Sequence, residues 1–149
     1  MPLAAVPEAT GADDGAEPTL DVPTPVAQSL HSRWYTQTIA PVLEVGETGF
    51  ITIQFQNVGQ ADWVRGTASE IRLGEVGARP LPTEMKVDWP LPNRPAVQEE
   101  PVVHVNQTAT FAFKVRGTSA GVYRLMVRPV VDGVAWLEDE GVFVDIHVR

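Results

Sequence analysis

The chain has 149 residues, 44% of them apolar, and a formal net charge of −8, which suits one ordinary domain with a hydrophobic core. Its few basic residues are scattered, which argues against a nucleic-acid partner, because such a partner requires a basic patch. The absence of cysteine excludes disulfides and thiolate metal sites, and the absence of any run of 18 apolar residues argues against membrane insertion.

Residues 1–30 differ in composition from the rest of the chain. They are acidic and rich in Pro, Ala and Thr, and they carry a charge of −5, whereas the remaining 119 residues carry only −3. Such a composition is typical of a segment that buries too little apolar surface to fold alone. We therefore expect an arm or linker over residues 1–30 and a folded domain over residues 31–149.

Part of this arm, residues 18–30, also has the pattern of an edge strand. Leu20, Val22 and Val26 share one parity, whereas Pro23 and Pro25 share the other. Both prolines would therefore lose N–H donors on the same edge, and the other edge would remain able to pair. The segment is predicted to add as a strand to a sheet, either of this chain or of a neighbouring copy.

From about residue 32 the apolar residues alternate with polar ones, as in β-strands. The order is a first strand near residues 32–39, a break at Pro41, a turn at 46–49, and strands over 50–58 and 69–76. The residues expected to face inward in these two strands are Ile51, Ile53, Phe55, Ile71 and Leu73. Residues 77–101 are rich in proline and predict a long irregular stretch.

The second half repeats this pattern after a predicted turn at Asn106–Gln107. Its last two strands are separated by a tight Asp132–Gly133 turn, which is a strong hairpin signal. The inward residues are expected to be Phe111, Phe113, Val115, Tyr123, Leu125, Val127, Val142, Val144, Ile146 and Val148. With no sustained helical period, about seven to nine short antiparallel strands predict an all-β, two-sheet sandwich.

Four tryptophans, Trp34, Trp63, Trp89 and Trp136, occur about once per expected sheet corner. Two of them belong to longer motifs, F-x-N-x-G-x-x-x-W over residues 55–63 and G-x-Y-x-x-x-x-x-P-V-x-x-G-x-x-W over residues 121–136. With these motifs, residues 32–149 resemble the four-tryptophan (FW) domain. The chain departs from that family at two turns, since Val45 and Asn106–Gln107 stand where many members have proline or Pro-Gly.

The resemblance implies an immunoglobulin-like β-sandwich that acts as a non-catalytic protein-interaction or structural module. The family is known from the central domain of a eukaryotic selective-autophagy cargo receptor and from bacterial, often secreted, multidomain proteins. It implies an extracellular or cell-envelope location for this chain, although no signal peptide is visible. The residues expected to be structural are Trp34, Trp136, Tyr123 and Asn57.

The residues that carry chemistry form no motif for catalysis, a cofactor or a metal. The three histidines lack ligand spacing, and no serine lies in a G-x-S-x-G elbow. Acidic residues are adjacent at Glu99–Glu100 and Glu138–Glu140, but glycosidases need two carboxylates facing each other across a cleft. We expect Glu138–Glu140 to be a solvated bend, with calcium binding as the alternative; Asn106 begins a glycosylation sequon.

Three functions remain open, and an enzyme is not among them. The first is a module that binds a protein through exposed Trp63, Trp89 and Arg94 at strand ends or loops. The second is a fibre or lattice subunit, in which Leu20, Val22 and Val26 enter a neighbour's sheet. The third is a carbohydrate-binding module, in which the same exposed tryptophans bind a glycan.

Overall fold

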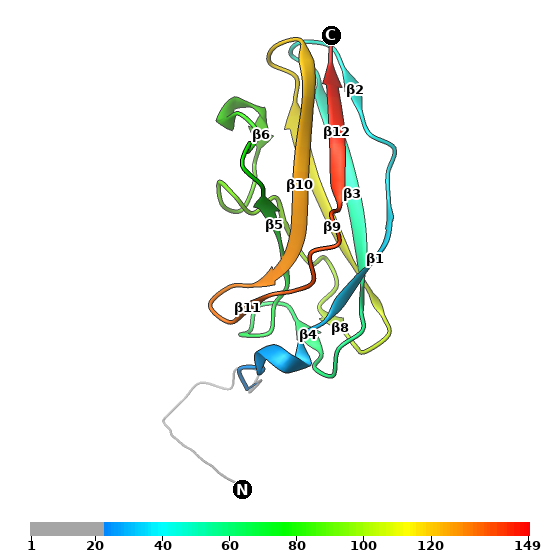
Figure 1. Ribbon diagram of the computed structural model, residues 1–149, viewed down its shortest axis with the longest axis vertical. Coiled ribbons are helices and arrows are strands. Elements are labelled where there is room, and N and C mark those ends of the chain that lie inside the picture. Colours follow the sequence, from blue (N-terminus) through cyan, green and yellow to red (C-terminus); the bar gives the residue numbers. More distant parts are fainter. Residues whose placement is uncertain (1–22) are drawn as a thin grey trace, which may run out of the picture.

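The computed structural model describes residues 23–149 and shows an all-β domain. Its only helical elements in this part of the chain are two short 3-10 turns, η1 (Ala27–Ser29) and η2 (Thr83–Met85). None of the described helical segments is long and apolar enough to cross a membrane. Two sheets pack face to face along the length of the molecule (Figure 1).

The first sheet has the order β1-β3-β9-β6, and the second has the order β2-β12-β10-β5-β7, with β11 paired to β10. A third, two-stranded sheet pairs β4 with β8. The longer strands are β1 (Ser32–Gln37), β3 (Thr48–Asn57), β5 (Arg72–Val76), β9 (Thr108–Arg116), β10 (Gly121–Val131) and β12 (Phe143–Val148). The two-residue strands are β2 (Val42–Leu43), β4 (Trp63–Val64), β6 (Lys86–Val87), β7 (Ala96–Val97), β8 (Val102–Val103) and β11 (Ala135–Trp136).

This strand order is that of an immunoglobulin fold. The four-stranded sheet corresponds to strands A, B, E and D, and the second sheet carries the G, F and C strands with an additional edge strand. The first strand is divided between the sheets, because β1 pairs with β3 whereas β2 lies parallel to β12. The predicted fold class is therefore confirmed, and the described chain has more strands than predicted because six of its twelve are only two residues long.

The core lies between the two sheets and is built from the alternating residues of the long strands. Ile51, Ile53 and Phe55 of β3 are buried, as predicted, and Phe55 meets Phe111 of β9 edge to face with ring centroids 6.1 Å apart. The second sheet contributes Leu125 of β10 and the buried residues of β12. Burial of each such side chain contributes about 1.5–3 kcal/mol to the free energy of folding. A slip of one residue would expose these side chains, so their burial fixes the register of both sheets.

Tyr123 and Asn57 hold two corners of the sandwich together. The Tyr123 hydroxyl, near the start of β10, donates to the Ser119 carbonyl at 2.9 Å, an arrangement typical of the tyrosine corner in immunoglobulin folds. Asn57 is fully buried, and its amide donates to the carbonyls of Ala61 and Val103 at 2.9 and 3.1 Å. Both side chains therefore connect turns to the ends of strands.

The proline-rich residues 77–101 are less irregular than predicted, because they contain η2, β6 and β7. Pro95 directly precedes β7 and limits it at that end, since proline cannot donate to a ladder. A buried ion pair closes this side of the sandwich, with Glu75 and Lys86 2.7 Å apart. The stretch thus connects the two sheets.

Residues 23–30 do not form the predicted strand. They form an irregular segment followed by η1, in which Val26 is 64% exposed and Leu30 joins the core. The Ser29 carbonyl accepts hydrogen bonds from Gln60 and Ala61, and a side chain at Gly59 would collide with it at 2.3 Å. The strand prediction is therefore wrong for residues 27–30, where this anchored turn replaces it; residues 23–26 form no strand within this chain, and Leu20 and Val22 lie outside the described residues.

Candidate interaction site

The four tryptophans occupy different environments, and Trp63 departs from the one predicted for it. Trp63, expected at an exposed loop and available to a partner, is 0% exposed. It lies in β4, where it pairs with Val103 of β8 and closes the end of the core. The expectation of a partner-binding Trp63 is therefore wrong, because a partner cannot reach a fully buried ring.

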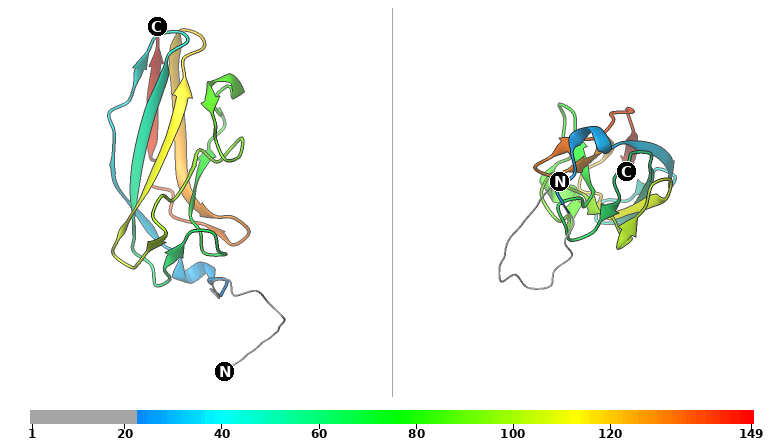
Figure 2. Two further views of the ribbon diagram at one scale, coloured as in Figure 1. Left: turned by 180° about the vertical axis from the view of Figure 1, so that it is seen from behind. Right: turned by 90° about the horizontal axis from the view of Figure 1, so that it is seen from below.

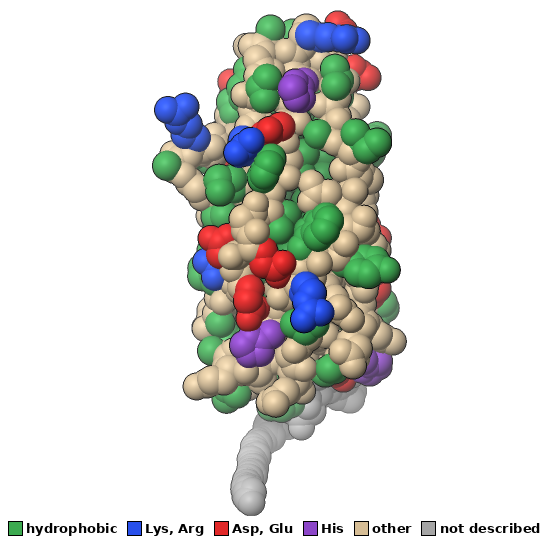
Figure 3. Space-filling view, turned by 45° about the vertical axis from the view of Figure 1, so that its right-hand side comes forward, with side chains coloured by type: hydrophobic (Ala, Val, Ile, Leu, Met, Phe, Trp, Pro, Cys, Tyr) green, Lys and Arg blue, Asp and Glu red, His purple; other side chains and the backbone are tan. Residues whose placement is uncertain are grey.

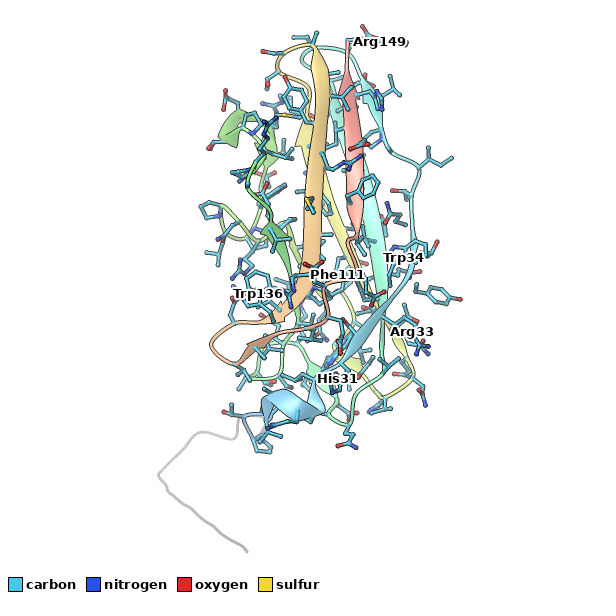
Figure 4. All side chains as sticks on the ribbon, in the orientation of Figure 1. His31, Arg33, Trp34, Phe111, Trp136 and Arg149 are labelled. Carbon is cyan, nitrogen blue, oxygen red and sulfur yellow. The ribbon has the colours of Figure 1, made fainter. Side chains whose placement is uncertain are left out.

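Trp136 and Trp34 are the exposed members of the four, and they lie on opposite sides of the sandwich (Figure 4). Trp136 is 43% exposed and covers Gly74, whose missing side chain leaves room for the ring. The guanidinium groups of Arg94 and Arg128 stack on this indole at 5.0 and 5.5 Å. Trp136 is thus held against the sheet by cation–π contacts and by close packing.

Trp89 and Arg94 are half-buried and contact different elements. Trp89 packs edge to face on Phe113 and donates from its indole nitrogen to the Lys114 carbonyl at 3.0 Å. Arg94 pairs with Asp132 at 2.7 Å, in the turn that begins the β10–β11 hairpin. With Trp63 in the core, these residues do not form the single exposed patch that the sequence suggested; any binding by Trp89 or Arg94 remains a prediction.

The adjacent acidic residues hold strand edges. Glu138 accepts from the Ser32 amide at 2.9 Å, and Glu140 accepts from the Trp34 amide at 3.1 and 3.2 Å, both on the edge of β1 that no strand of residues 23–149 covers. Glu100 binds the amide and hydroxyl of Thr110 on β9 in the same way. Glu138, Asp139 and Glu140 are all exposed, as expected for a solvated bend, but two of the carboxylates also bind main-chain donors of β1.

His31 connects this acidic bend to the N-terminal segment. Its Nδ1 lies 2.5 Å from Glu138, and its Nε2 lies 2.8 Å from the Gln28 carbonyl. The hydrogen bond to Glu138, followed by that to Gln28, raises the pKa of His31 above 6.5. Burial alone would raise the pKa of Glu138, but the hydrogen bonds from Ser32 and His31 outweigh it and lower that pKa.

No cluster of three or more His, Cys, Asp or Glu side chains with metal-binding geometry occurs in residues 23–149. The acids of the bend are directed at β1, and Asp139 accepts from the Gly141 amide at 3.0 Å. The hydrogen bonds of Glu138 and Glu140 therefore connect the bend to β1, whereas that of Asp139 lies within the bend.

An open groove of about 470 Å³ lies between β1 and β12, on a side of the molecule where apolar side chains gather (Figure 3). We call it the β1–β12 groove. Trp34 and Phe143, which flank it, are 39% and 41% exposed. It is lined by Trp34, Gln37, Ala40, Gly141, Val142, Phe143, Val144 and Asp145.

A short chain of hydrogen bonds crosses this groove. The Trp34 indole donates to the Gln37 side chain at 2.9 Å, and the Gln37 amide donates to the Phe143 carbonyl at 3.0 Å. On the far wall, Arg124 stacks on the Phe143 ring at 3.9 Å and pairs with Asp145 at 2.8 Å. The hydrogen bond from Arg124 lowers the pKa of Asp145. The groove therefore has an aromatic rim, formed by Trp34 and Phe143, and polar groups that hydrogen bonds hold in place.

Sequence reasoning missed Gln37, Ala40 and Phe143 as groove residues. One signal for Phe143 was available, because it has the opposite parity to Val142, Val144 and Ile146 and therefore points away from the core. No comparable signal existed for Gln37 or Ala40. They line the groove because the chain passes from one sheet to the other between β1 and β2 (Figure 2).

Comparisons with known proteins leave the family open. No family model matches the chain, and no curated protein matches it. The resemblance to the four-tryptophan domain therefore remains a prediction.

Two solved structures of the CARDB domain of the PF1109 protein from Pyrococcus furiosus share a similar fold. The solution NMR structure is 14% identical and has a TM-score of 0.47, over 80% of this chain and 94% of that one. The crystal structure, a complex with di-metal ions, is 10% identical and has a TM-score of 0.45, over 81% of this chain and 86% of that one. The strand order of this chain itself gives the class: an all-β sandwich of the immunoglobulin type.

Proposed function

We propose that this protein is a non-catalytic immunoglobulin-like interaction module that binds an extended protein segment in the β1–β12 groove. The observation that carries the proposal is the pair of half-exposed aromatic rings, Trp34 and Phe143, on either side of a groove whose floor is the edge of a strand. Aromatic side chains of this kind commonly anchor protein partners.

The environments of the acidic residues support binding rather than catalysis. Glu100, Glu138 and Glu140 accept hydrogen bonds from main-chain amides of the strands beside them. A general acid or a nucleophile needs a carboxylate that faces a substrate cleft. These three side chains are instead committed to the scaffold, which favours an interaction role.

The chemistry of the groove favours a polypeptide over a glycan. Glycan binding was predicted on exposed Trp63 and Trp89, but Trp63 is in the core. In the groove, the Trp34 indole nitrogen is already bonded to Gln37, and residues 143–145 of the lining belong to the edge of β12. Main-chain donors and acceptors beside apolar pockets are the groups that an extended peptide recognises.

The proposal includes an extracellular or cell-envelope setting, which only the resemblance to the four-tryptophan domain supports. The groove itself would work in any compartment.

The test is a selection of displayed random peptides on three forms of the full chain: wild type, Trp34→Ala/Phe143→Ala, and Phe50→Ala. Phe50 is the matched control, because it is 73% exposed in β3 and lines no part of the groove. We expect wild type and the control to enrich the same peptides, with apolar residues at alternate positions. The groove variant should bind them about tenfold more weakly or worse.

Far-ultraviolet circular dichroism and urea unfolding establish that all three proteins are folded. Enriched peptides that bind the Trp34→Ala/Phe143→Ala protein as tightly as the wild type would refute the proposed groove. The same conclusion follows if no peptide is enriched on the wild type over the groove variant.

A further inference from the structure

We propose that the extended segment that the groove accepts is residues 18–26 of a second copy of this chain, added to β12 as a strand. This inference rests on the proposed function of the groove. It names the strand edge with which the N-terminal arm pairs, and it makes the protein a module that associates with itself.

The acceptor is the edge of β12 next to the groove. His147 and Arg149 donate their amides to Pro41 and Leu43, on the side of β12 away from β10. Because N–H and C=O groups alternate between the two edges of a strand, Phe143 and Asp145 direct theirs to the same outer side. Val142, of the other parity, accepts from Val127 of β10, as this alternation requires.

Among the described residues, no strand covers this part of the edge. β2 pairs with β12 only at His147 and Val148. Upstream of these residues, Gln37 supplies a single side-chain donor, to the Phe143 carbonyl. The open stretch of the strand, residues 143–145, corresponds to about 10 Å, which is enough to pair with about three residues of an added segment.

The arm has the sequence that this edge requires. Residues 18–26 read PTLDVPTPV, in which Leu20, Val22 and Thr24 share a parity and keep their N–H donors. Pro23 and Pro25 have the opposite parity, so the N–H groups that they lack would belong to the other edge, which would face water. Leu20 and Val22 share one face, so both can contact the apolar lining of the groove.

The local geometry favours a second copy over the same chain. Residues 23–26 leave the end of the sandwich from the anchored turn η1, and Val26 is 64% exposed (Figure 1). Val22 and Thr24 each precede a proline, which biases both towards an extended backbone. An arm that entered its own groove would have to reverse direction within these stiff residues, whereas an arm that continues outward meets a neighbour.

Charge does not drive this association. Residues 1–30 carry −5 and the rest of the chain carries −3, so two copies repel each other. Apolar contacts and main-chain hydrogen bonds must supply the affinity, and salt should strengthen it by screening the repulsion. Donor and acceptor are different surfaces, so the copies form either a reciprocal dimer or a longer chain.

The test measures the mass of the full chain by sedimentation velocity over a concentration series, at low and at high salt. We expect wild type to associate, and to do so more strongly at high salt. Leu20→Ser/Val22→Ser should remain monomeric at every concentration. The matched control is Leu3→Ser/Val6→Ser, which removes two apolar side chains of the same arm outside residues 18–26 and should associate as wild type does.

The acceptor is tested with Asp145→Pro, which removes the outward N–H, against Asp145→Ala, which keeps it. Phe143→Ala is the second acceptor variant, in case the proline variant fails to fold. An acceptor variant and Leu20→Ser/Val22→Ser should each be monomeric alone and should form a heterodimer when mixed. A synthetic peptide of residues 17–26 should bind Leu20→Ser/Val22→Ser protein at least about tenfold more tightly than the same peptide with serines at 20 and 22.

A wild type that stays monomeric at high salt, or a Leu20→Ser/Val22→Ser protein that associates like wild type, would overturn the inference. If displayed peptides bind in a way that depends on Trp34 and Phe143 but the arm peptide does not bind, the groove function stands and only the arm as its occupant is refuted. Failure of both sets of peptides would remove the groove function as well.

Discussion

The buried ion pair between Glu75 and Lys86 gives the most direct test of how the two sheets are joined. The two side chains are 3% and 11% exposed, and their charged atoms are 2.7 Å apart. Glu75 also accepts from the Leu81 amide at 2.7 Å. Lys86 also donates to the Pro92 carbonyl at 2.6 Å and lies 5.0 Å from the Trp89 ring.

The change Lys86→Met keeps most of the side-chain volume but leaves the Glu75 carboxylate without its cation. Removing one partner of a buried pair costs about 3–5 kcal/mol, so we expect the free energy of unfolding to fall by this amount. For a chain of this length, 1 kcal/mol corresponds to about 2–4 °C in Tm, which predicts a loss of roughly 6–20 °C. Urea unfolding at neutral pH, followed by tryptophan fluorescence, measures the first quantity.

The double variant Glu75→Gln/Lys86→Met is the matched control. Glutamine retains an acceptor for the Leu81 amide, and no buried charge remains, so the double variant should be more stable than Lys86→Met by about 2 kcal/mol or more. A Lys86→Met protein within about 1 kcal/mol of wild type would show that the carboxylate is solvated. A double variant less stable than the single one would contradict the role of the unpaired charge.

Two further predictions concern Trp136 and His31. In Gly74→Ala, the new Cβ would lie 2.5 Å from the Trp136 ring, so the half-exposed ring should swing outward and the free energy of unfolding should fall by about 1–3 kcal/mol. Tryptophan fluorescence should then shift to longer wavelength, and unchanged emission would contradict the contact. The imidazolium of His31 should contribute fully to the attachment of the N-terminal segment below pH 6.5, and this contribution should be lost as the pH rises through its raised pKa. An NMR titration should therefore give a higher pKa for His31 than for the same residue in Glu138→Gln, and equal values would refute the pair.

The residues that alternate along strands were predictable, because burial of one face is a local property of a strand. Phe111, Phe113 and Val115 illustrate this, since each is buried as its parity requires. The Asp132–Gly133 turn was equally predictable, because Gly133 has the positive φ of 82° that this turn needs. Fold class followed from such local signals.

The exposure of the tryptophans was not predictable in the same way. Trp63 and Trp34 both lie in strands, yet Trp63 is buried by β8 from 40 residues further along the chain, whereas Trp34 lines the β1–β12 groove. That difference depends on which strands pair across the molecule. The roles of Glu138 and Glu140 were hidden for the same reason, because their partners, Ser32 and Trp34, lie 106 residues away in the chain.

The division of the first strand between two sheets has a mechanical consequence. The turn η1 and Arg149 lie at opposite ends of the sandwich (Figure 1), and β2 runs parallel to β12. The amides of His147, Arg149 and Val45 bond across this pair to Pro41, Leu43 and Arg149. A force that pulled these two ends apart would load all three hydrogen bonds at once, in shear. The sandwich would therefore resist stretching along its length better than peeling from one edge.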